Sequence, residues 1–193
     1  MKRICVYCGS NPGKSTEFLA SARTLAGELV QRDIGLVYGG ASVGLMGEIA
    51  DTVLAGGGEV IGVIPQALVD KEVSHPGLTE LKIVNSMHER KEIMADLSDG
   101  FIALPGGLGT IEEIFEVLTW AQLGFHHKPC ALLNVKGYYN QLTQFLNHAA
   151  AEGFIADTHR EMLLVGEHPH SLLEVMATYK APAVDKWIGR EET

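Results

Sequence analysis

Cysteine is scarce in this sequence, and its spacing excludes a redox role. Only three of the 193 residues are cysteine, namely Cys5, Cys8 and Cys130. Cys5 and Cys8 form a C-x-x-C pair, but both fall in a predicted strand, where residues three apart face opposite sides of a sheet. Thioredoxin-like pairs sit at the start of a helix instead. We therefore expect three buried, reduced thiols.

Positive charge is also scarce. The 15 lysines and arginines face 24 acidic residues, which gives a net charge of -9, and no basic cluster interrupts this acidity. A nucleic-acid polymer is excluded as a partner, because binding its phosphate backbone needs many cationic contacts. A single phosphate group is still compatible, since one loop of backbone amides and one arginine can hold it.

Apolar runs are too short for a signal peptide or a membrane span. The run that follows Lys2 and Arg3 stops at Cys8, short of the roughly 7–15 residues of a signal-peptide core. No stretch approaches the roughly 18 apolar residues of a transmembrane helix. We expect a cytoplasmic protein without membrane contact.

Common cofactor, metal and hydrolase motifs are absent too. The sequence contains no G-x-G-x-x-G fingerprint, P-loop, H-E-x-x-H motif or G-x-S-x-G elbow, and no Cys/His spacing of a zinc site. We expect no metal and no cofactor of the NAD or ATP type.

What the sequence does contain is a regular alternation of apolar, β-branched runs with helical patterns. The predicted strands are 3–8, 34–38, 59–64, 80–84, 100–104, 130–135 and 162–165, and the predicted helices are 15–32, 44–55, 87–98, 111–124, 139–152 and 170–179. Such alternation predicts an α/β fold with a doubly wound, mainly parallel sheet flanked by helices. We expect one domain over 1–180 and a partly mobile C-terminal tail over 181–193.

Local signals mark several boundaries. The glycines at 56–58 are typical of a helix end followed by a tight turn. Ser86 and Glu89 match a capping box, which predicts a helix from Met87. The connection 65–79 is the longest uncertain loop, and a loop of this length beside a site can act as a lid.

Three predicted strands end in glycine-rich turns, at 8–10, 38–44 and 104–110. The carboxyl ends of parallel strands meet at one edge of the sheet, where doubly wound folds bind ligands. Glycine lets the backbone approach a ligand, and a following helix offers unpaired amide protons. Turn geometry alone is the alternative explanation. The phosphate contacts that we expect here are Ser10, Gly40, Gly106, Gly107, Gly109 and Thr110.

Charged residues near these turns are the candidates for chemistry. Arg90 and Lys91 fall at the start of a helix, where the positive dipole end disfavours cations. A negatively charged ligand would explain them, and a solvated surface pair is the alternative. Glu113 also has two interpretations. It completes a second capping box with Thr110 at the N-cap, or its carboxylate serves the sugar of a nucleotide.

The segments 87–91 and 105–113 together resemble a known family. MHERK followed by PGGLGTIEE is similar to the paired motifs MHxRK and PGGxGTxxE of the LOG (lonely-guy) family, and their spacing also fits. The segments 38–47 and 132–139 look like further family segments, so the resemblance covers about 4–165.

This resemblance implies a Rossmann-like fold, frequently dimeric, and hydrolysis of nucleoside 5′-monophosphates to free base and ribose 5-phosphate. AMP and cytokinin riboside 5′-monophosphates are the implied substrates. Catalysis is assigned to Arg90 and Glu113, and further substrate contacts map onto Lys91, Glu72 and Thr119. We expect a homodimer through helices near 87–124, although a helix face buried within a monomer gives the same pattern.

Two details qualify the resemblance. Ala41 and Leu108 depart from a pattern that often has glycine and tyrosine, and Leu108 bears on the packing beside the nucleotide. Many family members carry a lysine decarboxylase label. Nothing in this sequence marks a lysine that would bind pyridoxal phosphate.

These expectations combine in a mechanism. The 5′-phosphate binds the amides of Gly107, Gly109 and Thr110, Arg90 anchors phosphate or sugar, and Glu113 stabilises an oxocarbenium-like ribose. The group that protonates the departing base is not identified. The alternative is a nucleotide-binding or sensor module without chemistry, which would use the same glycine turns.

Overall fold

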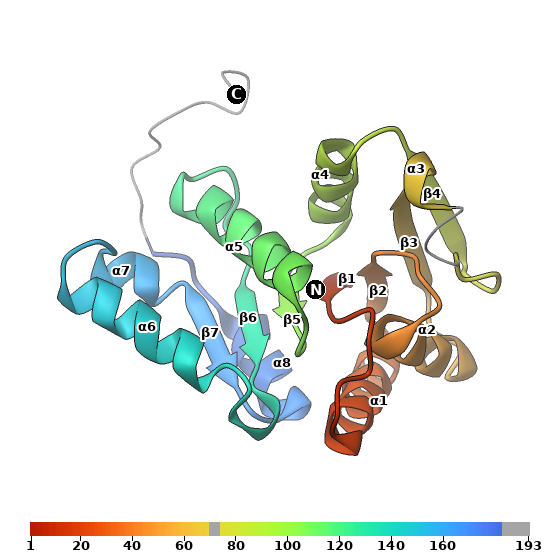
Figure 1. The fold of residues 1–193 in the computed structure, drawn as a ribbon, viewed down its shortest axis with the longest axis horizontal. Helices are drawn as coiled ribbons and strands as arrows, with labels where there is room; N and C mark the ends of the chain where they lie inside the picture. The colour runs from red at the N-terminus through yellow and green to blue at the C-terminus, as the bar shows by residue number, and fades with distance from the viewer. Residues whose placement is uncertain (70–73, 183–193) are drawn as a thin grey trace.

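Seven parallel strands form one sheet in the computed structural model, which describes residues 1–69 and 74–182 (Figure 1). The strands are β1 (Arg3–Tyr7), β2 (Gly35–Tyr38), β3 (Val60–Pro65), β4 (Glu80–Val84), β5 (Phe101–Ala103), β6 (Cys130–Leu133) and β7 (Leu163–Gly166). Their order is β4-β3-β2-β1-β5-β6-β7, with every neighbouring pair parallel. The chain starts at the centre, runs out to β4 and returns to place β5 beside β1. The predicted doubly wound sheet is therefore confirmed, and its order reverses between β1 and β5.

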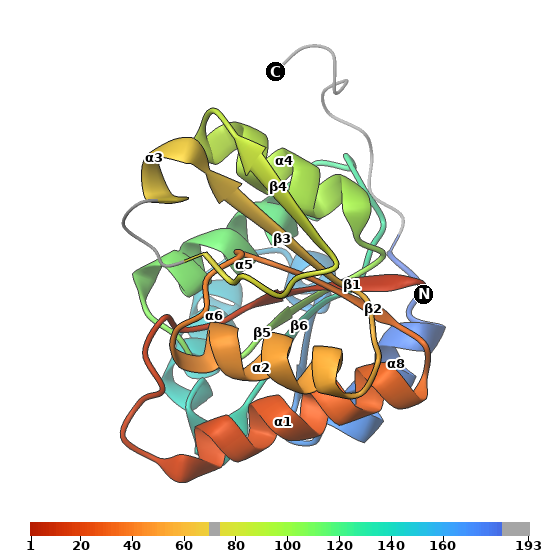
Figure 2. The same ribbon diagram turned by 90° about the vertical axis from the view of Figure 1, so that its right-hand side faces the viewer.

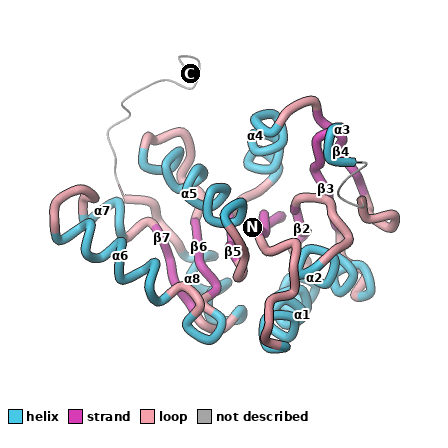
Figure 3. Tube along the Cα trace, in the orientation of Figure 1, coloured by secondary structure: helices cyan, strands magenta, loops and turns pink. Residues whose placement is uncertain are grey.

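Six helices cover the two faces of this sheet (Figures 2 and 3). On one face lie α1 (Thr16–Gln31), α2 (Gly44–Ala55) and α8 (Pro169–Thr178), and on the other lie α4 (Met87–Leu97), α5 (Leu108–Gln122) and α6 (Asn140–Ala151). Each predicted strand and helix is present. The short elements α3 (Gln66–Val69), η1 (Val135–Gly137) and α7 (Asp157–Arg160) were not predicted.

Alternate side chains of the central strands enter two separate cores. Cys5 and Tyr7 of β1 pack beneath α4 and α5, whereas Cys8 packs beneath α1 and α2. All three cysteines are buried and free, as predicted. Burial raises the pKa of Cys130 to about 12 and raises the pKa values of Cys5 and Cys8 further. The thiols are therefore protonated at neutral pH, which makes them poor nucleophiles.

The predicted boundary signals at 56–58 and at Ser86 are confirmed. Gly56 caps α2, and Gly57 follows in the left-handed region with φ 79°. Ser86 caps α4, since its hydroxyl accepts a hydrogen bond from the Glu89 N–H at 3.1 Å. The Glu89 carboxylate reaches back to the N–H of Asn85 at 2.7 Å. This second bond is one residue earlier than a capping box requires, yet it serves the same purpose.

The predicted start of the helix at 111 was wrong. Helix α5 begins at Leu108 rather than at 111, and its N-cap is Gly107, which has no side chain to form a cap. Thr110 is therefore the third residue of the helix and is 4% exposed. A Cβ at Gly106 would overlap with the Thr110 hydroxyl, so Gly106 makes room for this packing. Thr110 and Glu113 thus do not form a capping box.

Two predictions concern residues that the structure does not describe, wholly or for the most part. Glu72 lies outside the described ranges, as does the C-terminal tail except for its first two residues. Within the described ranges, no helix has the length and apolar character that crossing a bilayer requires.

Neighbouring residues of α6 allow a test of the core. Leu146 is 5% exposed and packs in the core beneath α6, whereas Phe145 is 63% exposed. Leu146→Ala should lower the free energy of unfolding in urea by about 2–5 kcal/mol, because it removes transfer energy and leaves a cavity. Phe145→Ala removes a larger side chain but should change it by about 0.5 kcal/mol or less. Equal losses in the two variants would contradict this packing.

Candidate active site

The three glycine-rich turns meet at the carboxyl edge of the sheet, as predicted. The Gly9 N–H donates to the Pro105 carbonyl at 3.1 Å, and the Leu45 N–H donates to the Gly9 carbonyl at 3.1 Å. Gly44 has φ 59°, and a Cβ there would overlap with the backbone of Ser10. Glycine is therefore required where these turns cross, and the crossing lies at the strand-order reversal between β1 and β5.

A cleft of about 360 Å³ opens beside these turns, between α4 and α5. Of the predicted site residues, its lining includes Ser10, Arg90, Gly107, Gly109, Thr110 and Glu113. Apolar side chains also reach it from four elements: Met46, Leu68, Met87 and Leu108.

The other predicted site residues lie elsewhere. Gly106 lines an adjoining hollow of about 310 Å³ together with Tyr138, whose hydroxyl donates to the Gly106 carbonyl at 2.6 Å. Gly40, with φ 82°, packs against β3 and β4 instead of lining the cleft. Thr119 is exposed in the last two turns of α5, where its hydroxyl donates to the Phe115 carbonyl.

A larger groove of about 610 Å³ lies at the opposite, amino edge of the sheet. Its charged residues Arg3 and Glu59 form an ion pair at 2.7 Å, and none of the predicted site residues borders it. The larger volume does not make this groove the candidate site. Ligands of doubly wound sheets bind at the carboxyl edge, where the smaller cleft lies.

The first turn of α5 provides the anion-binding donors. Its first backbone hydrogen bond runs from the Ile111 N–H to the Gly107 carbonyl at 3.2 Å. The N–H groups of residues 107–110 therefore precede the helical ladder, at the positive end of the helix dipole. Leu108 adds an amide that was missed, because the helix was expected to begin three residues later.

Arg90 provides a buried cation beside this turn. The residue is 6% exposed, and its Nη2 donates to the Gly39 carbonyl at 3.1 Å. Its Nη1 lies 3.8 Å from the sulfur of Met87. Among the described residues, Nε has no hydrogen-bond partner and no carboxylate pairs with the guanidinium. A buried charge without a counterion is costly, so this group is suited to an anionic ligand.

Gly39 is the residue that sequence reasoning missed. A Cβ at this position would overlap with Nη2 of Arg90 and with the end of Met46. The adjacent Gly40 was chosen instead, since both glycines follow the same strand. The position of Gly39 in the sequence could have identified it, because Gly39 comes directly after β2.

Arg90 and Glu113 approach the end of β1 from two helices. Burial raises the pKa of Tyr7 well above its ordinary value, and the nearby Cys5 thiol and Glu113 carboxylate raise it further. Burial also dominates the raised pKa of Cys5, which Glu113 increases and Arg90 decreases. Both charged groups therefore act on the same strand end, which places a cation and a carboxylate around one cleft.

Lys91 is bound to two carboxylates of α5. Its Nζ lies 2.7 Å from Glu112 Oε1 and 2.9 Å from Glu116 Oε1, and its side chain is 8% exposed. Burial by itself would lower the pKa of Lys91, but its hydrogen bonds to Glu112 and Glu116 raise it overall. Lys91 is therefore a charged residue of an ion-pair network.

The arrangement combines amide donors, a guanidinium and a carboxylate. Donors of this kind can hold a phosphate, and a carboxylate nearby can stabilise positive charge that develops on a sugar. Within the described ranges, no cluster of three or more His, Cys, Asp or Glu is placed to hold a metal ion.

The sequence matches one family model and is similar to proteins named as phosphoribohydrolases. A family model described as "Possible lysine decarboxylase" matches residues 46–176. The chain is 55% identical over 177 residues to "Probable cytokinin riboside 5′-monophosphate phosphoribohydrolase LOGL1" of Oryza sativa subsp. japonica, covering 92% of this chain and 79% of that protein. It is 51% identical over 178 residues to "Cytokinin riboside 5′-monophosphate phosphoribohydrolase LOG1" of Arabidopsis thaliana, covering 92% and 84%.

Solved structures with similar folds are more distant in sequence. The molybdenum cofactor carrier protein of Chlamydomonas reinhardtii matches with a TM-score of 0.68 at 20% identity, covering 91% of this chain and 96% of that one. The molybdenum cofactor binding protein of Rippkaea orientalis matches with a TM-score of 0.66 at 21% identity, covering 92% and 97%. At these identities the likeness shows the fold alone.

Gly39→Ala should weaken anion binding, because the added methyl group displaces Arg90. We expect the affinity for inorganic phosphate, measured by isothermal titration calorimetry, to fall about tenfold or more, as for a lost hydrogen bond to a charged group. Gly27→Ala is the matched control, since a Cβ there meets nothing within 4 Å. Unchanged phosphate affinity in a folded Gly39→Ala protein would contradict the placement of Arg90.

Proposed function

Because the chain belongs to the LOG family of cytokinin riboside 5′-monophosphate phosphoribohydrolases, we propose that its cleft hydrolyses the N-glycosidic bond of nucleoside 5′-monophosphates. AMP and cytokinin riboside 5′-monophosphates are the proposed substrates, and free base and ribose 5-phosphate are the products. One structural observation carries this proposal: the buried guanidinium of Arg90, which no carboxylate of the described residues pairs with, and the first-turn amides of α5 border the same cleft as Glu113.

The phosphate would bind at the start of α5. The amides of Gly107, Gly109 and Thr110 are the proposed donors, joined by the amide of Leu108. Arg90 lies across the cleft and would neutralise the phosphate or bind the sugar. Ser10 borders the same space, while Gly40 and Gly106 would shape the turns around it. Glu72 stays a proposed contact from the connection after α3.

Glu113 would act on the sugar. As the bond between ribose C1′ and the base nitrogen breaks, positive charge develops on the ribose, and a carboxylate stabilises it. Water then adds its hydroxyl group to C1′, and the remaining proton of that water goes to the nitrogen of the departing base. The Glu113 carboxylate is suited to orient this water or to hold the ribose hydroxyls.

Lysine decarboxylation is disfavoured by the state of Lys91. A lysine that forms a Schiff base needs a neutral amine, which proteins obtain by lowering the pKa of the lysine. Glu112 and Glu116 do the opposite, since they raise the pKa of Lys91. The family description "Possible lysine decarboxylase" therefore does not fit the charge state of Lys91.

The first experiment is chromatography of purified protein incubated with AMP. Adenine and ribose 5-phosphate should appear together in equal amounts. If AMP and a panel of other nucleoside 5′-monophosphates all stay intact while binding, the non-catalytic nucleotide-binding or sensor module becomes the better explanation.

Glu113→Gln should slow turnover of AMP about 100-fold or more, since losing one catalytic electrostatic contact costs about 2.7–4 kcal/mol. The control is Glu152→Gln, an exposed residue at the end of α6, which should keep the rate of the unmodified chain. Near-normal turnover in Glu113→Gln would remove Glu113 from the mechanism.

We also propose that the protein is a cytoplasmic homodimer. Partly buried apolar side chains lie on the two helices that border the cleft: Ile93 and Leu97 on α4, and Phe115, Leu118 and Trp120 on α5. A second copy packed against these helices would cover them. Thr119 lies among them but outside the cleft of its own chain, so its proposed substrate contact would be made to the partner copy. The buried, free thiols fit a reducing compartment.

Sedimentation velocity should find a species of twice the chain mass of 20.8 kDa. Leu118→Arg should shift it to the monomer, because it buries an unpaired charge in the proposed interface. Val175→Arg, at an exposed position on α8 on the opposite face, should stay dimeric. A monomeric wild-type chain, or a folded Leu118→Arg dimer, would contradict this interface.

A further inference from the structure

We propose that Lys91 is a positioning residue, which fixes Arg90 and Glu113 relative to one another by bridging α4 to two carboxylates of α5. This inference rests on the proposed function. It assigns Lys91 an indirect role in place of a contact with the substrate.

The residues that form the ion pairs lie next to Arg90 and Glu113 in the sequence. Lys91 follows Arg90 on α4, and Glu112 precedes Glu113 on α5. The Lys91 Nζ lies 2.7 Å from Glu112 and 2.9 Å from Glu116, which is one turn further along α5. Lys91 and Glu112 are therefore each adjacent in sequence to a proposed catalytic residue, and Glu116 lies about one turn beyond Glu113.

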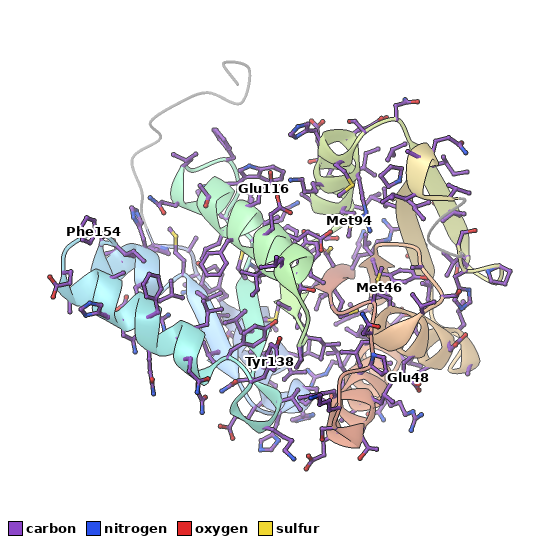
Figure 4. All side chains as sticks on the ribbon, viewed as in Figure 1. Met46, Glu48, Met94, Glu116, Tyr138 and Phe154 are labelled. Carbon is purple, nitrogen blue, oxygen red and sulfur yellow. The ribbon has the colours of Figure 1, made fainter. Side chains whose placement is uncertain are left out.

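The bridge joins two helices that share only one strand, β1, among the strands they mainly pack on. Helix α4 packs on β1, β2, β3 and β4, whereas α5 packs on β1, β5 and β6. Figure 4 labels Met94 on α4 and Glu116 on α5, and side chains fill the space between the helices. Among the described residues, the ion pairs that join α4 to α5 are the two that Lys91 makes.

The charges of the site require the bridge as well. Glu112 and Glu116 are four residues apart on α5, a spacing at which like charges repel. Lys91 lies between them and offsets this repulsion. Glu116 depends on it most, because its Oε1 bonds to Lys91 while its buried Oε2 has no partner among the described residues. Without Lys91, the carboxylates of Glu112 and Glu116 would lose the cation that both of them bond to.

A direct contact between Lys91 and the substrate phosphate predicts different behaviour. In that case the two carboxylates would compete with phosphate for Lys91, and removing their charge would leave KM unchanged or lower it. In the positioning role, removing either side of the bridge disturbs the same geometry. The two roles therefore differ in which kinetic constant changes and in whether the two sides act independently.

The test compares Lys91→Met, Glu112→Gln/Glu116→Gln and the triple variant in AMP hydrolysis, with Lys91→Arg as the conservative variant. Lys91→Met should lower kcat about tenfold or more while KM stays within about threefold, since misplaced catalytic groups slow the chemical step. The triple variant should be no slower than Lys91→Met by more than about twofold, because coupled residues are not additive. Lys91→Arg should recover most of the rate, since a guanidinium can bond to both carboxylates.

Urea unfolding of each variant tests whether the measured rates come from folded protein. The free energies of unfolding also measure the coupling between Lys91 and the two carboxylates independently of catalysis. Rate losses in Lys91→Met and in the carboxylate variant that multiply in the triple variant would overturn the proposal. So would a KM for Lys91→Met raised tenfold at unchanged kcat. Failure of the proposed function is a different result: the unmodified chain would leave every nucleotide intact.

Discussion

The close approach of two backbone turns at the centre of the sheet is the constraint on which the site depends. The turn after β1 and the turn after β5 are joined by the bond from the Gly9 N–H to the Pro105 carbonyl. This approach needs residues without side chains, and it fixes where α5 begins. The free amides of α5 therefore point into a defined cleft, and the helix brings Glu113 to the edge of that cleft.

Arg90 shows how the protein keeps a charge buried and available. Its guanidinium occupies the space left by the missing side chain of Gly39 and bonds to the carbonyl of that residue. A backbone carbonyl holds the group in place but does not neutralise it. Among the described residues, no carboxylate pairs with this guanidinium, whereas the neighbouring Lys91 is paired with Glu112 and Glu116.

Much of the fold and part of the site could be predicted from sequence. The pattern of apolar residues predicted every strand and longer helix, because this pattern is local. The helices bury one face, and most strands are apolar runs buried on both faces. Ser10, Arg90, Thr110 and Glu113 were placed near one another because the turns of parallel strands share an edge. Other features escaped prediction. The start of α5 was misplaced because Thr110 and Glu113 match a cap, whereas the packing of Thr110 against Gly106 depends on the folded turn.

By itself, the sequence determined the class of fold, the edge of the sheet that carries the site, and the motifs that place this chain in its family. These follow from periodicity, glycine positions and residue identity, which are all local. The tertiary structure decided which glycine accommodates Arg90, that Lys91 bonds to Glu112 and Glu116, and that Thr119 lies outside the cleft of its own chain. The physical reason is distance: α4 and α5 are far apart in the sequence and pack mainly on opposite sides of β1, so only the folded sheet sets the space between them.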